Sequence, residues 1–193
     1  MRRDARALAQ RERRGGAARG RRNECASASP SDAIAGGTTI AHVDSSDRSR
    51  VPLYVREGAI VPAEVSSSLT GLGAGSAMGA LTLVVYPAAA GSEFSVSEAD
   101  DTHTLVHASQ DVTSAMTIDL TPVRRRTVLR VRADMRVTGA ARGGVTITPA
   151  TDCAAFDAGT ADFFYDVSAR VARVRIPAPT GPPAGTTRIA LTP

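Results

Sequence analysis

The sequence of 193 residues has no Trp, no Lys, a single Asn and no long apolar run. Its most apolar stretch, residues 81–86, has the length of a β-strand and falls far short of the roughly 18 residues of a membrane-spanning helix. No apolar segment follows the N-terminus as it would in a secretion signal. With only three Tyr and four Phe, the chain has few aromatic rings to stack on a sugar. Neither a membrane protein nor an aromatic sugar-binding platform is therefore expected.

Cysteine is also scarce. The chain has only Cys25 and Cys153, with no Cys-x-x-Cys pattern and no histidine at metal-ligand spacing beside them. We expect both to be unpaired, small apolar side chains, which slightly favours a reducing compartment. No Asn-x-Ser/Thr sequence occurs, so nothing indicates N-glycosylation.

All 23 basic residues are Arg, and they are unevenly placed. Residues 1–22 carry a net charge of +7, whereas the other 171 residues carry −3. Because residues 1–37 also have few large apolar side chains to bury, we expect a disordered Arg-rich leader there. A mitochondrial-type presequence, a nucleic-acid-binding arm and upstream sequence read from a wrong start are the alternatives. Nucleic-acid binding is a weak interpretation, since the absence of Lys indicates a GC-rich gene.

From residue 38 onward the sequence changes to short β-rich runs separated by turn residues. The expected strands are 38–43, 51–55, 59–61, 81–86, 93–98, 103–107, 115–120, 127–133, 145–148, 162–167, 171–176 and 186–191. We expect strand 81–86 to be buried on both faces, because it is apolar throughout. Residues 64–80 are rich in Gly and Ser and predict a linker. This spacing of strands, with no convincing amphipathic helix, predicts an all-β fold of antiparallel sheets packed as a sandwich.

Three groups of residues could carry chemistry. Asp100 and Asp101 form a carboxylate pair, but neighbours on an extended chain point to opposite faces, so we expect turn residues. His103 and His107 lie about 13 Å apart if the segment is a strand, which is too far for one zinc ion. The glycines of 71–79 lack the Gly-Lys-Ser/Thr of a phosphate loop. The sequence therefore assigns no catalytic, cofactor-binding or metal-ligating residue.

The most informative stretch is residues 51–62, with the sequence VPLYVREGAIVP. Apolar and other residues alternate up to Glu57 and Gly58, where the alternation breaks, and an extended run follows. Gly58 can adopt a positive φ without steric cost, which predicts a turn there. Pro62 ends the unit because it has no N–H to donate. By periodicity alone, this is a strand, a turn and a second strand.

Two stretches resemble the C-terminal β-domains of glycoside hydrolase family 31, the α-glucosidase and α-xylosidase family. They are 49–62 (SRVPLYVREGAIVP) and 81–107 (LTLVVYPAAAGSEFSVSEADDTHTLVH), with GGTTI at 36–40 as a weaker third. The matching positions are Val51, Pro52, Val55, Arg56, Glu57, Gly58, Ile60 and Pro62, then Leu81, Val85, Tyr86, Pro87, Gly91, Phe94, Glu98, Asp100 and Asp101. The resemblance covers about residues 36–135. Ser97 replaces a family Tyr, Ala99 is inserted and no Gly follows the Asp pair, which predicts a reshaped turn.

The resemblance implies a domain organisation. Its parts are a leader (1–37), a remnant of the proximal β-domain (38–63), a linker (64–80) and the distal β-sandwich (81–193). The family's catalytic (β/α)₈ barrel has no counterpart here. Its nucleophile lies in a W-x-D-M-N-E type motif, and the only Asp-Met, Asp134 and Met135, lacks the Trp and the Asn-Glu.

The resemblance therefore implies the C-terminal, non-catalytic part of a family 31-like α-glycosidase, an enzyme class that hydrolyses O-glycosyl bonds in carbohydrate metabolism. Alone, the chain is expected to be inactive and to need no cofactor. Its expected partner is a catalytic barrel or a carbohydrate. A free-standing carbohydrate-binding or interaction module is the alternative.

Overall fold

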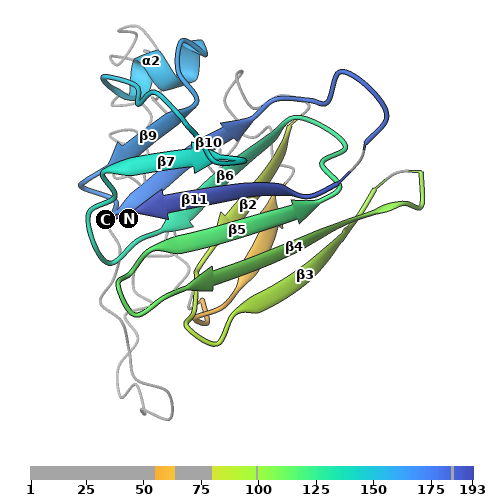
Figure 1. Ribbon diagram of the computed structural model, residues 1–193, viewed down its shortest axis with the longest axis horizontal. Coiled ribbons are helices and arrows are strands. Elements are labelled where there is room, and N and C mark those ends of the chain that lie inside the picture. The colour runs from red at the N-terminus through yellow and green to blue at the C-terminus, as the bar shows by residue number, and fades with distance from the viewer. Residues whose placement is uncertain (1–54, 64–79, 99, 184) are drawn as a thin grey trace, which may run out of the picture.

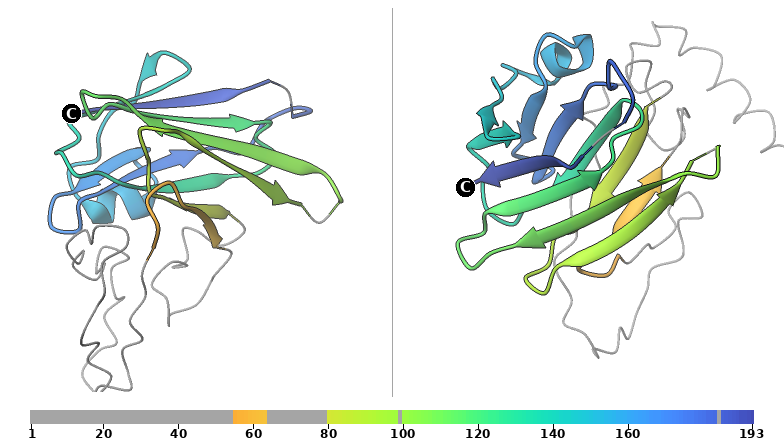
Figure 2. Two further views of the ribbon diagram at one scale, coloured as in Figure 1. Left: turned by 90° about the horizontal axis from the view of Figure 1, so that it is seen from below. Right: turned by 45° about the vertical axis from the view of Figure 1, so that its right-hand side comes forward.

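Two β-sheets stacked face to face make up the molecule in the computed structural model (Figures 1 and 2). The structure describes residues 55–63, 80–98, 100–183 and 185–193. The described part is nearly all β, so the predicted all-β sandwich is confirmed. The expected leader 1–37, the strand 38–43 and nearly all of the linker 64–80 lie outside the described residues. Within the described ranges, no helix is long and apolar enough to cross a membrane.

The first sheet has five strands in the order β1-β2-β6-β10-β9. Their bounds are β1 (Ile60–Ala63), β2 (Leu81–Val85), β6 (Thr127–Arg132), β10 (Val171–Ile176) and β9 (Phe163–Asp166). All neighbours are antiparallel except β2 and β6, which run parallel. This parallel pair departs from the purely antiparallel prediction. It arises because the chain leaves this sheet after β2, builds three strands of the other sheet and returns at β6.

The second sheet has six antiparallel strands in the order β3-β4-β5-β11-β7-β8. Their bounds are β3 (Ser92–Ser97), β4 (His103–Gln110), β5 (Met116–Thr121), β11 (Thr187–Thr192), β7 (Gly139–Arg142) and β8 (Val145–Thr146). The C-terminal strand β11 lies between β5 and β7, so the end of the chain closes the middle of this sheet (Figure 1).

The core lies between the two sheets. In β4, exposed and buried residues alternate, as expected for a strand with one face on the core. In β2, four of the five residues are buried and Val84 is half-buried, which agrees with the predicted burial of both faces. The fully buried residues of the core include Leu83, Val85, Val106, Ile118, Leu120, Leu129, Val131, Val174, Ile189 and Leu191. Burial of these apolar side chains is the main stabilising contribution.

One short helix, α2 (Cys153–Ala158), was not expected. The Asp152 carboxylate caps its start by accepting a hydrogen bond from Ala155 N at 2.8 Å, and Gly159, with φ 79°, ends it. Phe156 packs it onto the outer face of the five-stranded sheet, beside Val128. Six residues are too few to show a helical period, so periodicity could not reveal α2.

Cys153 is disulfide-bonded, so the expectation of an unpaired thiol is wrong. The only other cysteine in the sequence, Cys25, lies outside the described residues. Sequence spacing could not show the bond, because a disulfide depends on the distance between two Cα atoms in the folded chain. The disulfide removes the free thiol on which the expectation of a reducing compartment rested.

Candidate functional site

The first resemblance motif forms a tight turn at the edge of the five-stranded sheet. Ala59 N donates to the Arg56 carbonyl oxygen at 3.1 Å, and Gly58 is the third turn residue, with φ 83°. A hydrogen bond of this span with a positive φ at the third position is typical of a type II turn. The positive φ predicted for Gly58 is confirmed. Arg56 and Glu57 are exposed, and backbone groups close the turn.

The same turn is joined to the second resemblance motif. The Gly58 backbone N–H donates to the Tyr86 carbonyl oxygen at 2.7 Å, and the Tyr86 backbone N–H donates to the Ala59 carbonyl oxygen at 2.9 Å. Gly58 and Ala59 thus lie opposite the single residue Tyr86. Two residues opposite one, with a glycine in the left-handed conformation as the first of the two, define a G1 β-bulge. Along an antiparallel pair, successive residues bond alternately toward the partner strand and away from it. Ala59 bonds toward Tyr86, so Pro62, three residues on, has its nitrogen directed away from β2, to the free edge of the sheet. A proline there costs no ladder hydrogen bond.

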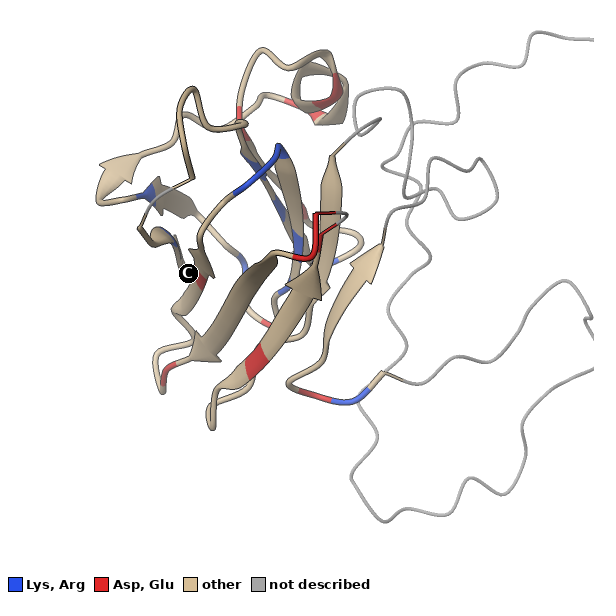
Figure 3. Cartoon of the chain, turned by 90° about the vertical axis from the view of Figure 1, so that its right-hand side faces the viewer, with Lys and Arg blue, Asp and Glu red and all other residues tan. Residues whose placement is uncertain are grey.

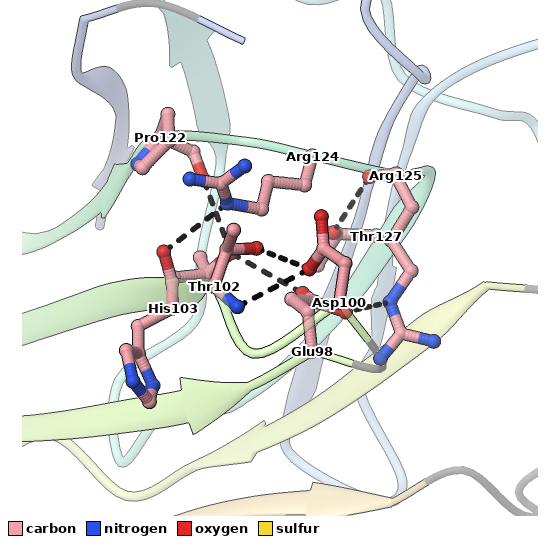
Figure 4. A network of polar contacts seen from close by, with 9 residues as sticks. Glu98, Asp100, Thr102, His103, Pro122, Arg124, Arg125 and Thr127 are labelled. Atoms are coloured by element: carbon pink, nitrogen blue, oxygen red, sulfur yellow. Dashed lines mark hydrogen bonds and ion pairs between the residues drawn. The ribbon is translucent and has the colours of Figure 1, made fainter.

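The second motif ends in an acidic turn between β3 and β4 (Figure 4). The Glu98 backbone N–H donates to the Thr102 carbonyl oxygen at 2.8 Å, and Asp101 has φ 60°. Asp is among the few residues that tolerate this left-handed conformation. Asp100 Oδ1 accepts hydrogen bonds from the Thr102 hydroxyl and the Thr102 backbone N–H, which lower the pKa of Asp100, and the Arg124 charge adds to this effect. Both Asp residues are therefore turn residues, as predicted.

Glu98 ties this turn to the loop between β5 and β6. Its Oε2 lies 3.0 Å from Arg125 Nε, and its side chain is only 10% exposed. The Thr104 hydroxyl lies 3.3 Å from Glu98 Oε1 and 3.1 Å from the Pro122 oxygen. Because a hydroxyl has one proton, these two acceptors share it. The Glu98 carboxylate is engaged on both oxygens, an arrangement suited to holding two loops together (Figure 4).

A second ion pair lies on the outer face of the six-stranded sheet. The Arg188 guanidinium donates to both Asp119 carboxylate oxygens, at 2.8 Å and 2.7 Å. These bonds lower the pKa of Asp119 and raise that of Arg188. In the strand register His107 is opposite Asp119 on one side and Glu93 on the other. The four residues form one row of polar side chains across β3, β4, β5 and β11.

A third polar centre holds α2 in place. The Arg175 guanidinium donates to the carbonyl oxygens of Phe156 and, at 3.3 Å, Ala161. It also lies 3.7 Å from the Asp162 carboxylate and stacks 4.6 Å from the centre of the Phe156 ring. Arg175 belongs to β10, and Figure 3 draws the arginines of β6 and β10 in blue and the acidic turn between β3 and β4 in red. Nothing in the sequence predicted this centre or the Asp119–Arg188 pair, because the partners are separated along the chain.

The two histidines considered as metal ligands lie on one strand, β4. His103 and His107 both lie on the exposed face of β4. In the described part of the chain, no group of three or more His, Cys, Asp or Glu side chains could hold a metal ion. The glycines of 71–79 lie outside the described residues. The polar groups that the structure does bring together are engaged with one another and join loops, strands and α2.

The sequence matches no protein-family model and no curated protein. The fold does match parts of solved enzymes. One is a cycloalternan-forming enzyme from Listeria monocytogenes in complex with a pentasaccharide substrate, at 22% identity and a TM-score of 0.60, over 71% of this chain and 13% of that one. Another is a glycoside hydrolase family 31 dextranase from Flavobacterium johnsoniae, at 14% identity and a TM-score of 0.51, over 72% and 19%.

These matches show that the β-sandwich fold of this chain also occurs in a family 31 dextranase and a cycloalternan-forming enzyme, in agreement with the resemblance of the two motifs. This chain spans less than a fifth of the length of either enzyme. The shared part is therefore a β-sandwich that occurs within much larger carbohydrate-active enzymes.

Proposed function

We propose that this chain is the non-catalytic β-sandwich part of a family 31-like α-glycosidase, without the barrel that hydrolyses O-glycosyl bonds. The observation that carries the proposal is the G1 bulge, in which Gly58 and Tyr86 join the two family-like motifs. Two motifs that resemble one family in sequence and also pair in space form a single structural unit. The fold shared with the cycloalternan-forming enzyme and the dextranase supports the same interpretation.

Two carboxylates of the described residues, Glu98 and Asp166, are engaged by the chain itself, which supports a non-catalytic role. Glu98 is engaged by Arg125 and Thr104. Asp166 is buried and accepts hydrogen bonds from the Ser168 hydroxyl at 2.7 Å and from Ala169 N. A general acid or nucleophile has to face a substrate, and these groups instead bind neighbouring elements of the same chain.

The partner proposed for this sandwich is a catalytic barrel or a carbohydrate. The division into leader, proximal remnant, linker and distal sandwich remains part of the proposal. In that division β1 lies in the segment 38–63, and it is the strand that extends the five-stranded sheet beyond β2.

The test is a hydrolysis assay on the purified full chain with nitrophenyl α-glucoside and α-xyloside. We expect no release of nitrophenol above that of buffer, and turnover that scales with the amount of protein contradicts the proposal. A family 31 enzyme assayed in parallel shows that the conditions support the reaction.

The alternative, a free-standing carbohydrate-binding module, has its own test. Titration with maltose and xylose oligosaccharides, followed by tyrosine fluorescence, should leave the signal of the chain's three tyrosines unchanged. A saturable change favours the alternative over the proposed role as the non-catalytic part of a glycosidase. Few exposed rings are available for stacking, which is why we place this function second.

A further inference from the structure

The strand β3 (Ser92–Ser97) forms one edge of the six-stranded sheet (Figure 1). It pairs with β4 on one side, and no described strand pairs with its other side. Glu93, Ser95 and Ser97 are exposed, and the Phe94 side chain keeps 38% of its surface exposed although it lies on the core side of the strand. Among the residues that the structure describes, no strand hydrogen-bonds to this edge.

The ladder with β4 decides which backbone groups remain unpaired. The Glu98 backbone N–H donates to the Thr102 carbonyl oxygen, so residue 98 bonds toward β4. In an antiparallel pair every second residue bonds in the same direction, so the backbone groups of residues 92, 94 and 96 also bond to β4. The N–H and C=O groups of Glu93, Ser95 and Ser97 consequently point away from β4, to the free edge. They offer three donors and three acceptors in a row.

The two outer strands on this side of the sandwich differ in protection. Natural edge strands are usually blunted by Pro, Lys or a bulge. β1 has both Pro62 at its free edge and the bulge at Gly58. β3 has no proline, no basic residue and a regular six-residue ladder. An unprotected edge of this kind is a template for the addition of another strand.

We propose that the occupant of this edge is β3 of a second copy of the chain, antiparallel, with the two-fold axis at Ser95. In this register each of the three free residues faces one of the three in the other copy, Ser95 against Ser95 and Glu93 against Ser97. A shift by two residues in either direction leaves at least one residue of each strand without a partner from this set. The symmetric register therefore satisfies all the free backbone groups of both edges.

The side chains of β3 are also compatible with the register in which Ser95 lies opposite Ser95 of the second copy. The two Glu93 carboxylates lie at opposite ends of the paired strands, each beside a Ser97 hydroxyl of the other copy, so no like charges face each other. On the core side, Phe94 faces Val96 of the second copy at a non-hydrogen-bonded position, where side chains approach most closely. This contact covers the exposed part of the Phe94 ring. The result is one continuous twelve-stranded sheet across the two copies, twice the six strands of each.

The proposal does not depend on the glycosidase relationship, because it rests on the edge of β3 alone. Its test is the sedimentation of the full chain over a concentration series, with two opposite substitutions at the axis. Ser95→Lys and Ser95→Glu each place two like-charged side chains directly opposite each other, on Cα atoms about 5.5 Å apart, and should weaken the dimer about tenfold. An equimolar mixture of the two variants should restore it, since opposite charges then meet at the axis.

Two further comparisons make the result specific to this edge. Thr146→Lys on β8, at the other edge of the same sheet, is the matched control and should leave the dimer unchanged. Ser97→Lys should tighten the dimer severalfold, because two new pairs with Glu93 form, and this gain does not depend on damaging the fold. A chain that stays monomeric at every concentration overturns the proposal. So does a dimer that Ser95→Lys leaves intact, or one that Ser97→Lys does not tighten.

Discussion

The amide of Gly58 donates to the carbonyl oxygen of Tyr86 at 2.7 Å, and this bond joins the two sequence motifs, residues 49–62 and 81–107. The first motif supplies the left-handed Gly, and the second supplies the single residue that the bulge faces. Neither half of the bulge exists without the other. The family resemblance thus describes how one edge of the sandwich is built.

Gly58→Ala tests the importance of this bulge. The added Cβ would lie 3.6 Å from Ala88 Cβ and 3.7 Å from Ser92 Cβ, which are ordinary contacts. The cost therefore comes from φ 83°, a conformation that side chains with a Cβ disfavour by about 1–2 kcal/mol. We expect a loss of unfolding free energy of about that size, measured by urea denaturation.

Gly181→Ala is the matched control, because its added Cβ meets nothing within 4 Å. It should change the urea midpoint little. Equal effects of the two substitutions would contradict the role assigned to the Gly58 conformation.

Glu98 and Arg125 should be energetically coupled. Glu98→Gln and Arg125→Gln remove the ion pair from either side, and the double variant completes a cycle. Since the Glu98 side chain is 10% exposed and that of Arg125 31%, we expect a coupling energy of about 0.5–1.5 kcal/mol from chemical denaturation. Additive single effects would show that the two loops are held by other contacts.

The Asp119–Arg188 pair predicts a pH dependence of stability. Hydrogen bonds from Arg188 lower the pKa of Asp119 in the folded chain. A group of this kind stabilises the fold above its unfolded pKa of about 3.9, and the contribution is lost as the pH falls through the folded pKa. Asp119→Asn should therefore lower the urea midpoint at neutral pH, and the difference from wild type should shrink at more acidic pH, below about 4.

Asp134→Asn provides the comparison for this pH series, because that carboxylate is 78% exposed. Its midpoint should follow the wild type throughout. A gap between wild type and Asp119→Asn that is constant down to acidic pH would show that charge on Asp119 plays no part.

Arg175→Lys should loosen α2. A lysine ammonium cannot reproduce the planar fork that reaches the Phe156 and Ala161 oxygens, nor the stacking on the Phe156 ring. We expect about 1–3 kcal/mol of local destabilisation, seen as faster hydrogen exchange of the α2 amides. Arg136→Lys, at an exposed position, is the control. Unchanged exchange in α2 would remove Arg175 from this role.

Several elements could be predicted from local sequence because their signals are local. The strand 171–176 agrees with β10 at both ends, and 81–86 agrees with β2 within one residue. The turn at Gly58 followed from the freedom of glycine, and the turn at Asp100 and Asp101 followed from the polar break between two strands. The short strand β7 and the helix α2 were missed, since four and six residues carry too little periodicity.

The candidate site could be predicted only in part. Glu98 was singled out by the motif, but its partners Arg125 and Thr104 come from another loop and another strand. The Asp119–Arg188 pair joins residues 69 positions apart. For the same reason, the sequence predicted an unpaired thiol at Cys153, where the structure has a disulfide. Each of these contacts depends on strand order, which local patterns do not contain.

The sequence by itself determined the alternation that makes strands, the places where the chain turns, and the two motifs that indicate family 31. These are properties of neighbouring residues, governed by backbone sterics and by which face of a strand is apolar. Only the tertiary structure decided that β2 runs parallel to β6, that the two motifs meet in one bulge, and that β3 is the outermost of the described strands in its sheet. These features depend on which strands become neighbours, and that choice is made by packing the whole core at once.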